Sequence, residues 1–148
     1  MQIKDTFLVF IFCFFSLAFA QSQTKINSTS EYYLKNCFSI FDKKNTLKTK
    51  NGWQFWFVDK TIADGYTLKM SKIASDSATH IAHSHPDPEI FYILEGKAEF
   101  TLGNEKTIAG PNSSLYCPPN ILHGIRNAGT DSLKYLVLKQ YLSKGIKV

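Results

Sequence analysis

The sequence is poor in arginine, and it has no CxxC pair, internal repeat or low-complexity tract. Arg126 is the only arginine among 17 basic residues, and the lysines are scattered apart from a loose group at Lys43, Lys44, Lys48 and Lys50. Nucleic-acid binding usually needs clustered basic residues and arginine side chains. Nucleic acid is therefore not an expected partner, and the net charge of +5 indicates a solubilising surface.

The chain also lacks an apolar run long enough to cross a membrane. The uncharged run from Phe7 to Phe15 is shorter than the roughly 20 residues that a spanning helix needs. Lys4 precedes this run, and Ala18 and Ala20 form the small-x-small pattern of a cleavage site. We therefore predict that residues 1–20 are a signal peptide cleaved after Ala20. The mature chain is then secreted or periplasmic, without a membrane anchor.

Residues 21–148 are enough for one domain with a sizeable core, and too few for a two-domain enzyme. We predict that residues 21–52 form a polar leader and N-terminal segment. Within it, residues 31–41 are expected to be a short helix or an irregular segment, and residues 43–52 a loop. Cys37 and Cys117 either form a structural disulfide, which the compartment permits, or remain two buried, inert thiols.

From Trp53 onward, short runs rich in β-branched and aromatic residues alternate with turn-forming residues. Strands at such close spacing predict an all-β sandwich or barrel. The runs are Trp53 to Val58, Tyr66 to Ile73, Thr79 to His83, Glu89 to Leu94, Ala98 to Leu102, Lys106 to Ala109, Ser114 to Cys117, His123 to Arg126 and Leu133 to Leu142.

Residues with metal-binding chemistry are concentrated between His83 and His123. On a strand, His83 and His85 point the same way, because side chains alternate between the two faces. Two prolines then turn the chain, so that Glu89 opens the next strand and can face the same interior. Imidazoles with one carboxylate suit first-row metals such as Mn, Fe, Ni, Cu or Zn. A single HxH pair also occurs on ordinary surfaces, so it does not identify a site by itself.

The wider context of these residues resembles a known family. His83-Ser84-His85-Pro86-Asp87-Pro88-Glu89, followed after six residues by Gly96, resembles the first cupin motif. Pro118-Pro119-Asn120-Ile121-Leu122-His123, followed after three residues by Asn127, is similar to the second. The resemblance implies a double-stranded β-helical jelly-roll barrel over residues 53–148. It also implies that His83, His85, Glu89 and His123 ligate one divalent transition metal.

Three positions depart from the family pattern. Asn112 and Asn120 stand where the second motif carries glycine, and asparagine tolerates the left-handed backbone that those positions suggest. Ser77 replaces a glycine before the first motif, which a differently shaped loop accommodates. No metal ligand is affected.

The alternation of side chains along each strand predicts the direction in which the remaining residues face. His80 is expected to face away from His83, at the surface, and Arg126 to face solvent or an interface. An inward, core-forming parity is shared by Phe91, Ile93, Phe100, Leu115, Cys117 and Ile125. Cupins of this size often pair through aromatic strands such as Trp53 to Phe57, so the resemblance also implies a homodimer.

The resemblance leaves the reaction open, because one fold hosts many functions. The favoured hypothesis is a metal-dependent enzyme of dioxygenase, isomerase or lyase type that acts on a small organic acid, sugar or phenolic compound. The alternatives are a noncatalytic small-molecule or sugar-binding protein, and a protein that stores or scavenges the metal itself.

Overall fold

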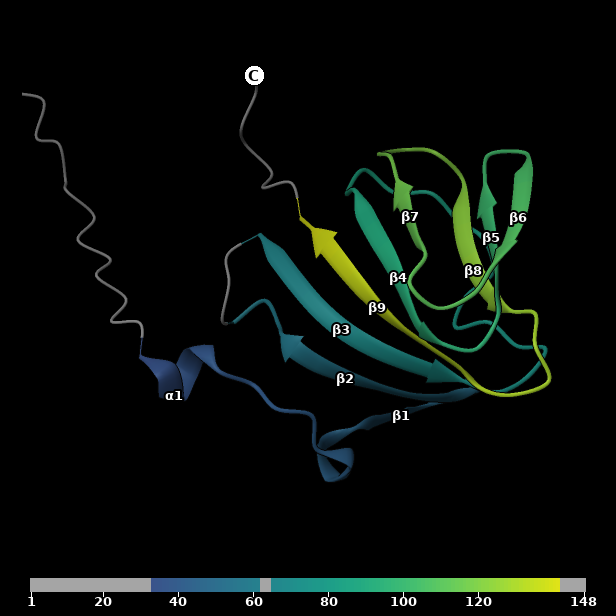
Figure 1. Cartoon of the computed structure of the whole chain (residues 1–148). Helices are drawn as coiled ribbons and strands as arrows, with labels where there is room; N and C mark the ends of the chain where they lie inside the picture. Colours follow the sequence, from purple (N-terminus) through teal and green to yellow (C-terminus); the bar gives the residue numbers. More distant parts are fainter. Residues whose placement is uncertain (1–32, 62–64, 142–148) are drawn as a thin grey trace, which may run out of the picture. The chain divides into compact units, whose positions relative to one another are not determined.

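The computed structural model describes residues 33–61 and 65–141, so the predicted signal peptide lies outside the described residues. The described chain begins with one helical turn, α1 (Leu34–Cys37), and the 3-10 turn η1 (Lys43–Asn45), and continues as two antiparallel sheets (Figure 1). None of the described helices has the length and apolar character needed to cross a membrane.

Nine strands make up the two sheets of the described chain. They are β1 (Leu47–Thr49), β2 (Gly52–Val58), β3 (Tyr66–Ile73), β4 (Glu89–Glu95), β5 (Ala98–Leu102), β6 (Glu105–Ala109), β7 (Ser114–Cys117), β8 (His123–Asn127) and β9 (Leu133–Gln140). The larger sheet has the order β1-β2-β3-β9-β4-β7, and the smaller has the order β6-β5-β8. Neighbours such as β3 and β9 are far apart in sequence, which gives the chain its jelly-roll path.

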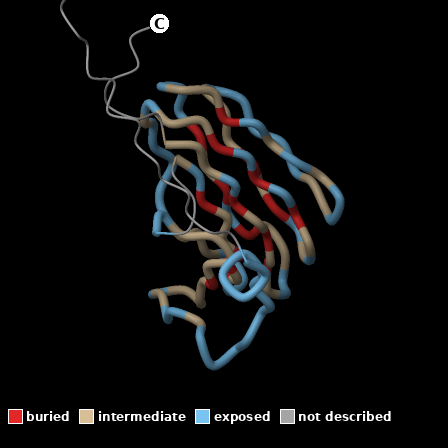
Figure 2. Tube along the Cα trace, turned by 90° about the vertical axis from the view of Figure 1, so that its left-hand side faces the viewer, coloured by how far each residue is buried: buried red, intermediate tan, exposed pale blue. Residues whose placement is uncertain are grey.

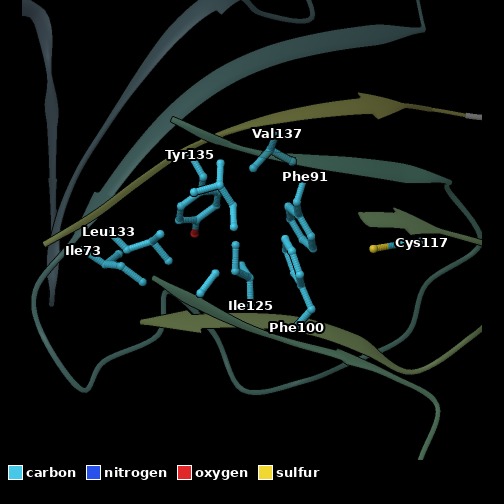
Figure 3. Packing of buried hydrophobic residues seen from close by; sticks show 10 residues of the cluster. Ile73, Phe91, Phe100, Cys117, Ile125, Leu133, Tyr135 and Val137 are labelled. Carbon is cyan, nitrogen blue, oxygen red and sulfur yellow. The ribbon is translucent and has the colours of Figure 1, made fainter. Parts of the chain in front are cut away.

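Alternating burial along the strands creates the core between the sheets. In β4, for example, Glu89, Phe91 and Ile93 are buried while Ile90 and Tyr92 are exposed. Figure 2 shows the buried positions as red segments along the strands. The predicted inward residues are confirmed: all six lie in or against one apolar cluster, with Leu115 at its margin. Figure 3 shows this cluster spanning the two sheets.

The jelly-roll class is confirmed, but the described sheets are not closed all round into a barrel. The predicted strand from Thr79 to His83 is wrong. Between β3 and β4 the chain makes only two isolated bridges to β8, Ala78 with Arg126 and His83 with His123. The intervening residues bend away from the ladder, so the strict alternation expected there does not hold.

The segment before Trp53 is more ordered than a loop. Residues 43–52 contain η1 and β1, and β1 pairs with β2 in an antiparallel ladder. Phe41 stacks on Trp53 with ring centres 5.3 Å apart and meets Phe55 edge-on at the same distance. Part of the aromatic surplus of β2 therefore packs against the chain's own N-terminal segment.

Two asparagines occupy the turns where the family pattern has glycine. Asn112 and Asn120 have φ angles of 65° and 61°, which confirms the left-handed backbone predicted for them. Gly96 has a φ of 89°, and an added Cβ would lie 2.7 Å from the Ser132 carbonyl oxygen. This motif position therefore requires glycine for both conformation and space.

The two cysteines of the described chain are both free, with Cys37 exposed and Cys117 buried. Of the two alternatives left open by the sequence, the structure thus supports free thiols. Only Cys117 fits the description of a buried one. Burial is the main cause that raises the pKa of the Cys117 thiol, to about 12, with the Glu89 carboxylate adding to it. The thiol is therefore protonated and unreactive at neutral pH.

Candidate metal centre

Three histidines from two separate stretches of the chain meet at one end of the space between the sheets. His83 and His85 lie in the connection between β3 and β4, whereas His123 is the first residue of β8. Two backbone hydrogen bonds join the stretches: the His83 amide donates to the His123 carbonyl at 3.0 Å, and the reverse bond is 2.8 Å long. This reciprocal bridge fixes the two side chains next to each other.

The imidazoles form a compact group. One ligand nitrogen from each of His83, His85 and His123 lies within 4.8 Å of the others. The ring centres are separated by 4.7 to 5.3 Å, and the rings are tilted or perpendicular rather than stacked. Nitrogens that converge at such distances could bind one metal ion among them.

Backbone carbonyls orient two of the three rings. His123 Nδ1 lies 2.7 Å from the Ile121 carbonyl oxygen, and His83 Nδ1 lies 3.1 Å from that of Ile81. A carbonyl oxygen only accepts, so in each case Nδ1 carries the proton and donates it, and Nε2 holds the free electron pair. This arrangement is typical of metal-binding histidines, because a bond to the other nitrogen fixes the tautomer.

His123 has an unsatisfied ligand atom. Its side chain is fully buried, and Nε2 has no hydrogen-bond partner. Burial lowers the pKa of His123, and the neighbouring His85 and His83 add to this, which outweighs the opposing effects of the Ile121 carbonyl and Glu89. The neutral imidazole that a metal requires is thus favoured. A buried polar atom without a partner is costly, and a metal ion would satisfy it.

Glu89 adjoins the three histidines as the first residue of β4. The carboxylate is buried, with Oε1 3.2 Å from His85 Nε2 and Oε2 3.7 Å from His123 Nε2. The structure therefore brings all four predicted ligands to one place. The compact group itself consists of the histidines, and Glu89 contacts two of them.

Sequence reasoning missed Lys139, which also enters the site. It lies on β9 directly opposite Glu89, and its ammonium is 3.1 Å from Glu89 Oε1 and 3.0 Å from His85 Nε2. Asp87 lies slightly farther away, at 3.7 Å. A signal was present in the sequence, because Lys139 shares the parity of Leu133, Tyr135 and Val137, which all face inward.

His80 is exposed, as predicted, but it does not face away from the site. Its ring lies edge-on to that of His83, with centres 5.9 Å apart. The prediction of an opposite face assumed a regular strand, and the bends between residues 78 and 83 remove that alternation. Arg126 does face outward, where it pairs with Glu99 on β5 at 3.1 Å.

A cavity of about 170 Å³ opens beside the histidines. Phe91, Ile125 and Val137 contribute apolar surface to its wall, while His83 and Glu89 connect it to the candidate metal site. Such a volume suits a ligand of only a few heavy atoms, because sites for drug-sized ligands are larger.

Asn127, the last residue of the second motif, stabilises the loops rather than the site. Its side chain is fully buried, and its amide donates to the carbonyls of Ala74 and Asp131 at 2.9 and 2.6 Å. Its side-chain oxygen accepts from the Gly129 amide at 2.9 Å. The motif asparagine therefore ties the chain after β3 to the turn before β9.

Comparison with known proteins agrees with this architecture. Residues 70–139 match the family model of the cupin domain. The uncharacterized protein MJ1618 of Methanocaldococcus jannaschii is 42% identical over 57 residues, which is 38% of this chain and 46% of that protein. The aligned region thus spans less than half of that curated relative.

Several solved structures share the fold at low identity. The polyketide cyclase RemF from Streptomyces resistomycificus has a TM-score of 0.61 and 16% identity, with 73% of this chain and 82% of that chain covered. A Cupin 2 conserved barrel domain protein from Salinispora arenicola has a TM-score of 0.60 and 16% identity, with 72% of this chain and 88% of that chain covered. A predicted oxalate decarboxylase from Thermotoga maritima has a TM-score of 0.58 and 19% identity, with 66% of this chain and 90% of that chain covered.

The fold and the histidine group together define a jelly-roll protein with three histidines that could hold a metal ion. The family match makes this more specific: residues 70–139 match the cupin domain family, and solved cupin structures share the fold of this chain.

Proposed function

We propose that this protein binds one divalent transition metal through His83, His85, His123 and Glu89, and that it is an enzyme for a small organic acid, sugar or phenolic compound. Two observations carry this proposal: His123 Nε2 is buried without a hydrogen-bond partner, and one nitrogen from each of the three imidazoles lies within 4.8 Å of the others. When bound, such a metal supplies Lewis-acid activation of a ligand in its open positions.

The chain's own residues prepare the site for this chemistry. The carbonyls of Ile81 and Ile121 hold two imidazoles in fixed orientations with their Nε2 atoms free. Glu89 contributes a negative charge beside them, and the adjoining cavity leaves room for a small molecule. The names of two structural neighbours, a polyketide cyclase and a predicted oxalate decarboxylase, agree with an enzymatic role for such a site.

One observation favours a noncatalytic binding protein as the second candidate. Lys139 contacts both Glu89 and His85, so a side-chain cation already neutralises the carboxylate. A pocket organised in this way could hold a small molecule or sugar without a metal.

A metal assay combined with a substrate screen separates the two candidates. Protein purified without added metal is analysed for Mn, Fe, Ni, Cu and Zn, then loaded and incubated with organic acids, uronates and phenolics. Stoichiometric metal with turnover supports the enzyme. Saturable binding that is unaffected by chelation, without turnover, supports the second candidate and contradicts the first.

We also propose export and self-association. The signal-peptide pattern of residues 1–20 supports export, and mass spectrometry of the mature chain should give an N-terminus at Gln21; a retained Met1 contradicts it. The aromatic content of β2 supports a homodimer. Sedimentation equilibrium at micromolar concentration tests the dimer, and a monomer mass contradicts it.

A further inference from the structure

The cavity beside the histidines contains two lysines from neighbouring strands. Lys69 on β3 and Lys139 on β9 both line it, whereas Glu89 is the only acidic residue among the described residues of its wall. The two lysines leave the same face of the sheet, since Thr67 pairs with Lys139 and Lys69 pairs with Val137 in the β3-β9 ladder. The wall thus carries more positive than negative charge before any metal is counted.

The two lysines differ in their partners. Lys139 is paired with Glu89 at 3.1 Å and with Asp87 at 3.7 Å. Lys69, by contrast, forms no ion pair with any residue that the structure describes. Its ammonium lies 5.3 Å from the centre of the Trp56 ring, a contact that leaves its hydrogen-bond donors available. Lys69 is therefore the cation that a ligand could pair with.

Partial burial makes the unpaired charge of Lys69 costly. Burial is the main cause that lowers the pKa of Lys69; the Glu89 charge opposes this only in part, and Lys139 lowers the pKa further. A partly buried ammonium that forms no ion pair loses hydration without full compensation. An anion in the cavity would supply the missing interaction.

The other walls restrict what this anion can be. Phe91, Ile125 and Val137 present apolar surface that matches a carbon skeleton, and the cavity of about 170 Å³ limits its length. The hydroxyls of Thr79 and Tyr135 also line the cavity, but they hydrogen-bond to each other at 2.6 Å. A neutral sugar would need several free neutral donors and acceptors, so these walls favour a short carboxylate.

We infer that the cavity selects a short-chain organic carboxylate and that Lys69 is the residue that pairs with its carboxylate group. This inference deepens the proposed function, because it names the substrate class of the same site. Lys139 can contribute as well: the electron pair of His85 Nε2 cannot serve both a metal and the Lys139 ammonium, so metal binding would release that contact.

Binding of malonate tests the inference by isothermal titration calorimetry on the full mature chain. Malonamide serves as the neutral isostere, and inorganic phosphate as an anion without a carbon skeleton. Each titration is carried out on metal-loaded and on chelator-treated protein. We expect malonate to bind at least about tenfold more tightly than either comparison compound, because a hydrogen bond to a charged group is worth about that factor or more.

Three variants assign the effect to Lys69. We expect Lys69→Met to weaken malonate binding roughly tenfold or more, and Lys69→Arg to keep it within about threefold. Lys72→Met is the matched control, since Lys72 lies on the same strand with opposite parity and is not part of the cavity wall. Circular dichroism and melting curves verify that each variant is folded.

Equal malonate affinity in wild type and Lys69→Met overturns the inference, as does equal affinity for malonamide or phosphate. Metal titration of the same samples keeps the two proposals apart. A chain that binds no metal but loses malonate affinity in Lys69→Met disproves the metal centre alone. A chain that binds metal but shows no effect of Lys69 disproves only the carboxylate site.

Discussion

The two ends of the space between the sheets differ sharply in chemistry, although the same strands line both. Along β4 the inward residues run from Glu89 through Phe91 to Ile93, and along β9 from Lys139 through Val137 and Tyr135 to Leu133. One end is therefore ionisable and opens to the cavity, and the other is closed and apolar.

Because of this difference, the closed end should contribute mainly to folding stability and the open end mainly to binding. The closed end supplies close-packed apolar burial, which is the dominant favourable contribution to folding. The open end carries a carboxylate, histidines and lysines, whose burial costs free energy unless a partner compensates for it. Substitutions at the two ends should therefore affect different measured quantities.

The largest effect should come from the open end. His123→Ala and Glu89→Gln should each weaken metal binding by more than about 100-fold, since direct ligands matter more than the groups that orient them. Metal-dependent thermal stabilisation should disappear as well, because the ion binds the folded state. Metal titration and melting curves measure both. A wild-type affinity in His123→Ala would exclude the four-ligand site.

At the closed end, Ile93→Ala should lower the free energy of unfolding by about 3 kcal/mol while metal affinity stays unchanged. Ile93 is fully buried, and truncation leaves a cavity that the packed surroundings only partly fill. Ile90→Ala is the matched control, because its side chain lies on the outer face of the same strand. Urea denaturation should show a much smaller loss there, and equal losses would contradict the assigned parity.

A polar residue near the closed end gives an intermediate case. Asn127→Ala should cost about 2 kcal/mol of unfolding free energy, since it removes the three hydrogen bonds of a buried side chain and leaves their backbone partners unpaired. Metal affinity measured on the folded variant should remain close to that of wild type. A selective loss of metal binding without a loss of stability would instead place Asn127 in the site.

Mild acid should release the metal. Imidazoles must be neutral to coordinate, so protons compete with the metal as the pH falls below the ordinary histidine pKa of about 6.5. Burial holds the pKa of His123 below that value, so in the metal-free protein the unfolded state binds more protons over this interval. Stability should thus also decline as the pH falls. Metal content that stays constant into strong acid would show that histidines do not hold the ion.

The smallest effect is expected at the rim. His80→Ala should leave metal affinity within about threefold of wild type, because His80 lies outside the compact ligand group although it lines the cavity. Burial lowers the pKa of His80, and the positive charge of Lys69 lowers it further. A loss as large as that of His123→Ala would make His80 a ligand.

The strand pattern was largely predictable from the sequence, and its exceptions have physical reasons. The bounds of β3, β5 and β7 agree with prediction, because alternating apolar residues between turn formers are a local signal. The stretch from Thr79 to His83 has the composition of a strand, yet it bends. The polar β1 was missed, because its place is set by pairing with β2 and not by its own composition.

The sequence by itself determined most of the strands, because the alternation of apolar residues between turn formers is a local property. The four residues that gather at the candidate metal centre, and the left-handed turns at Asn112 and Asn120, were implied by the resemblance of two sequence motifs to those of the cupin family. Only the tertiary structure placed Lys69, Lys139 and His80 beside that centre. Their positions depend on which distant strands pair and in which register, because β3, β4 and β9 become neighbours only through long-range hydrogen bonding.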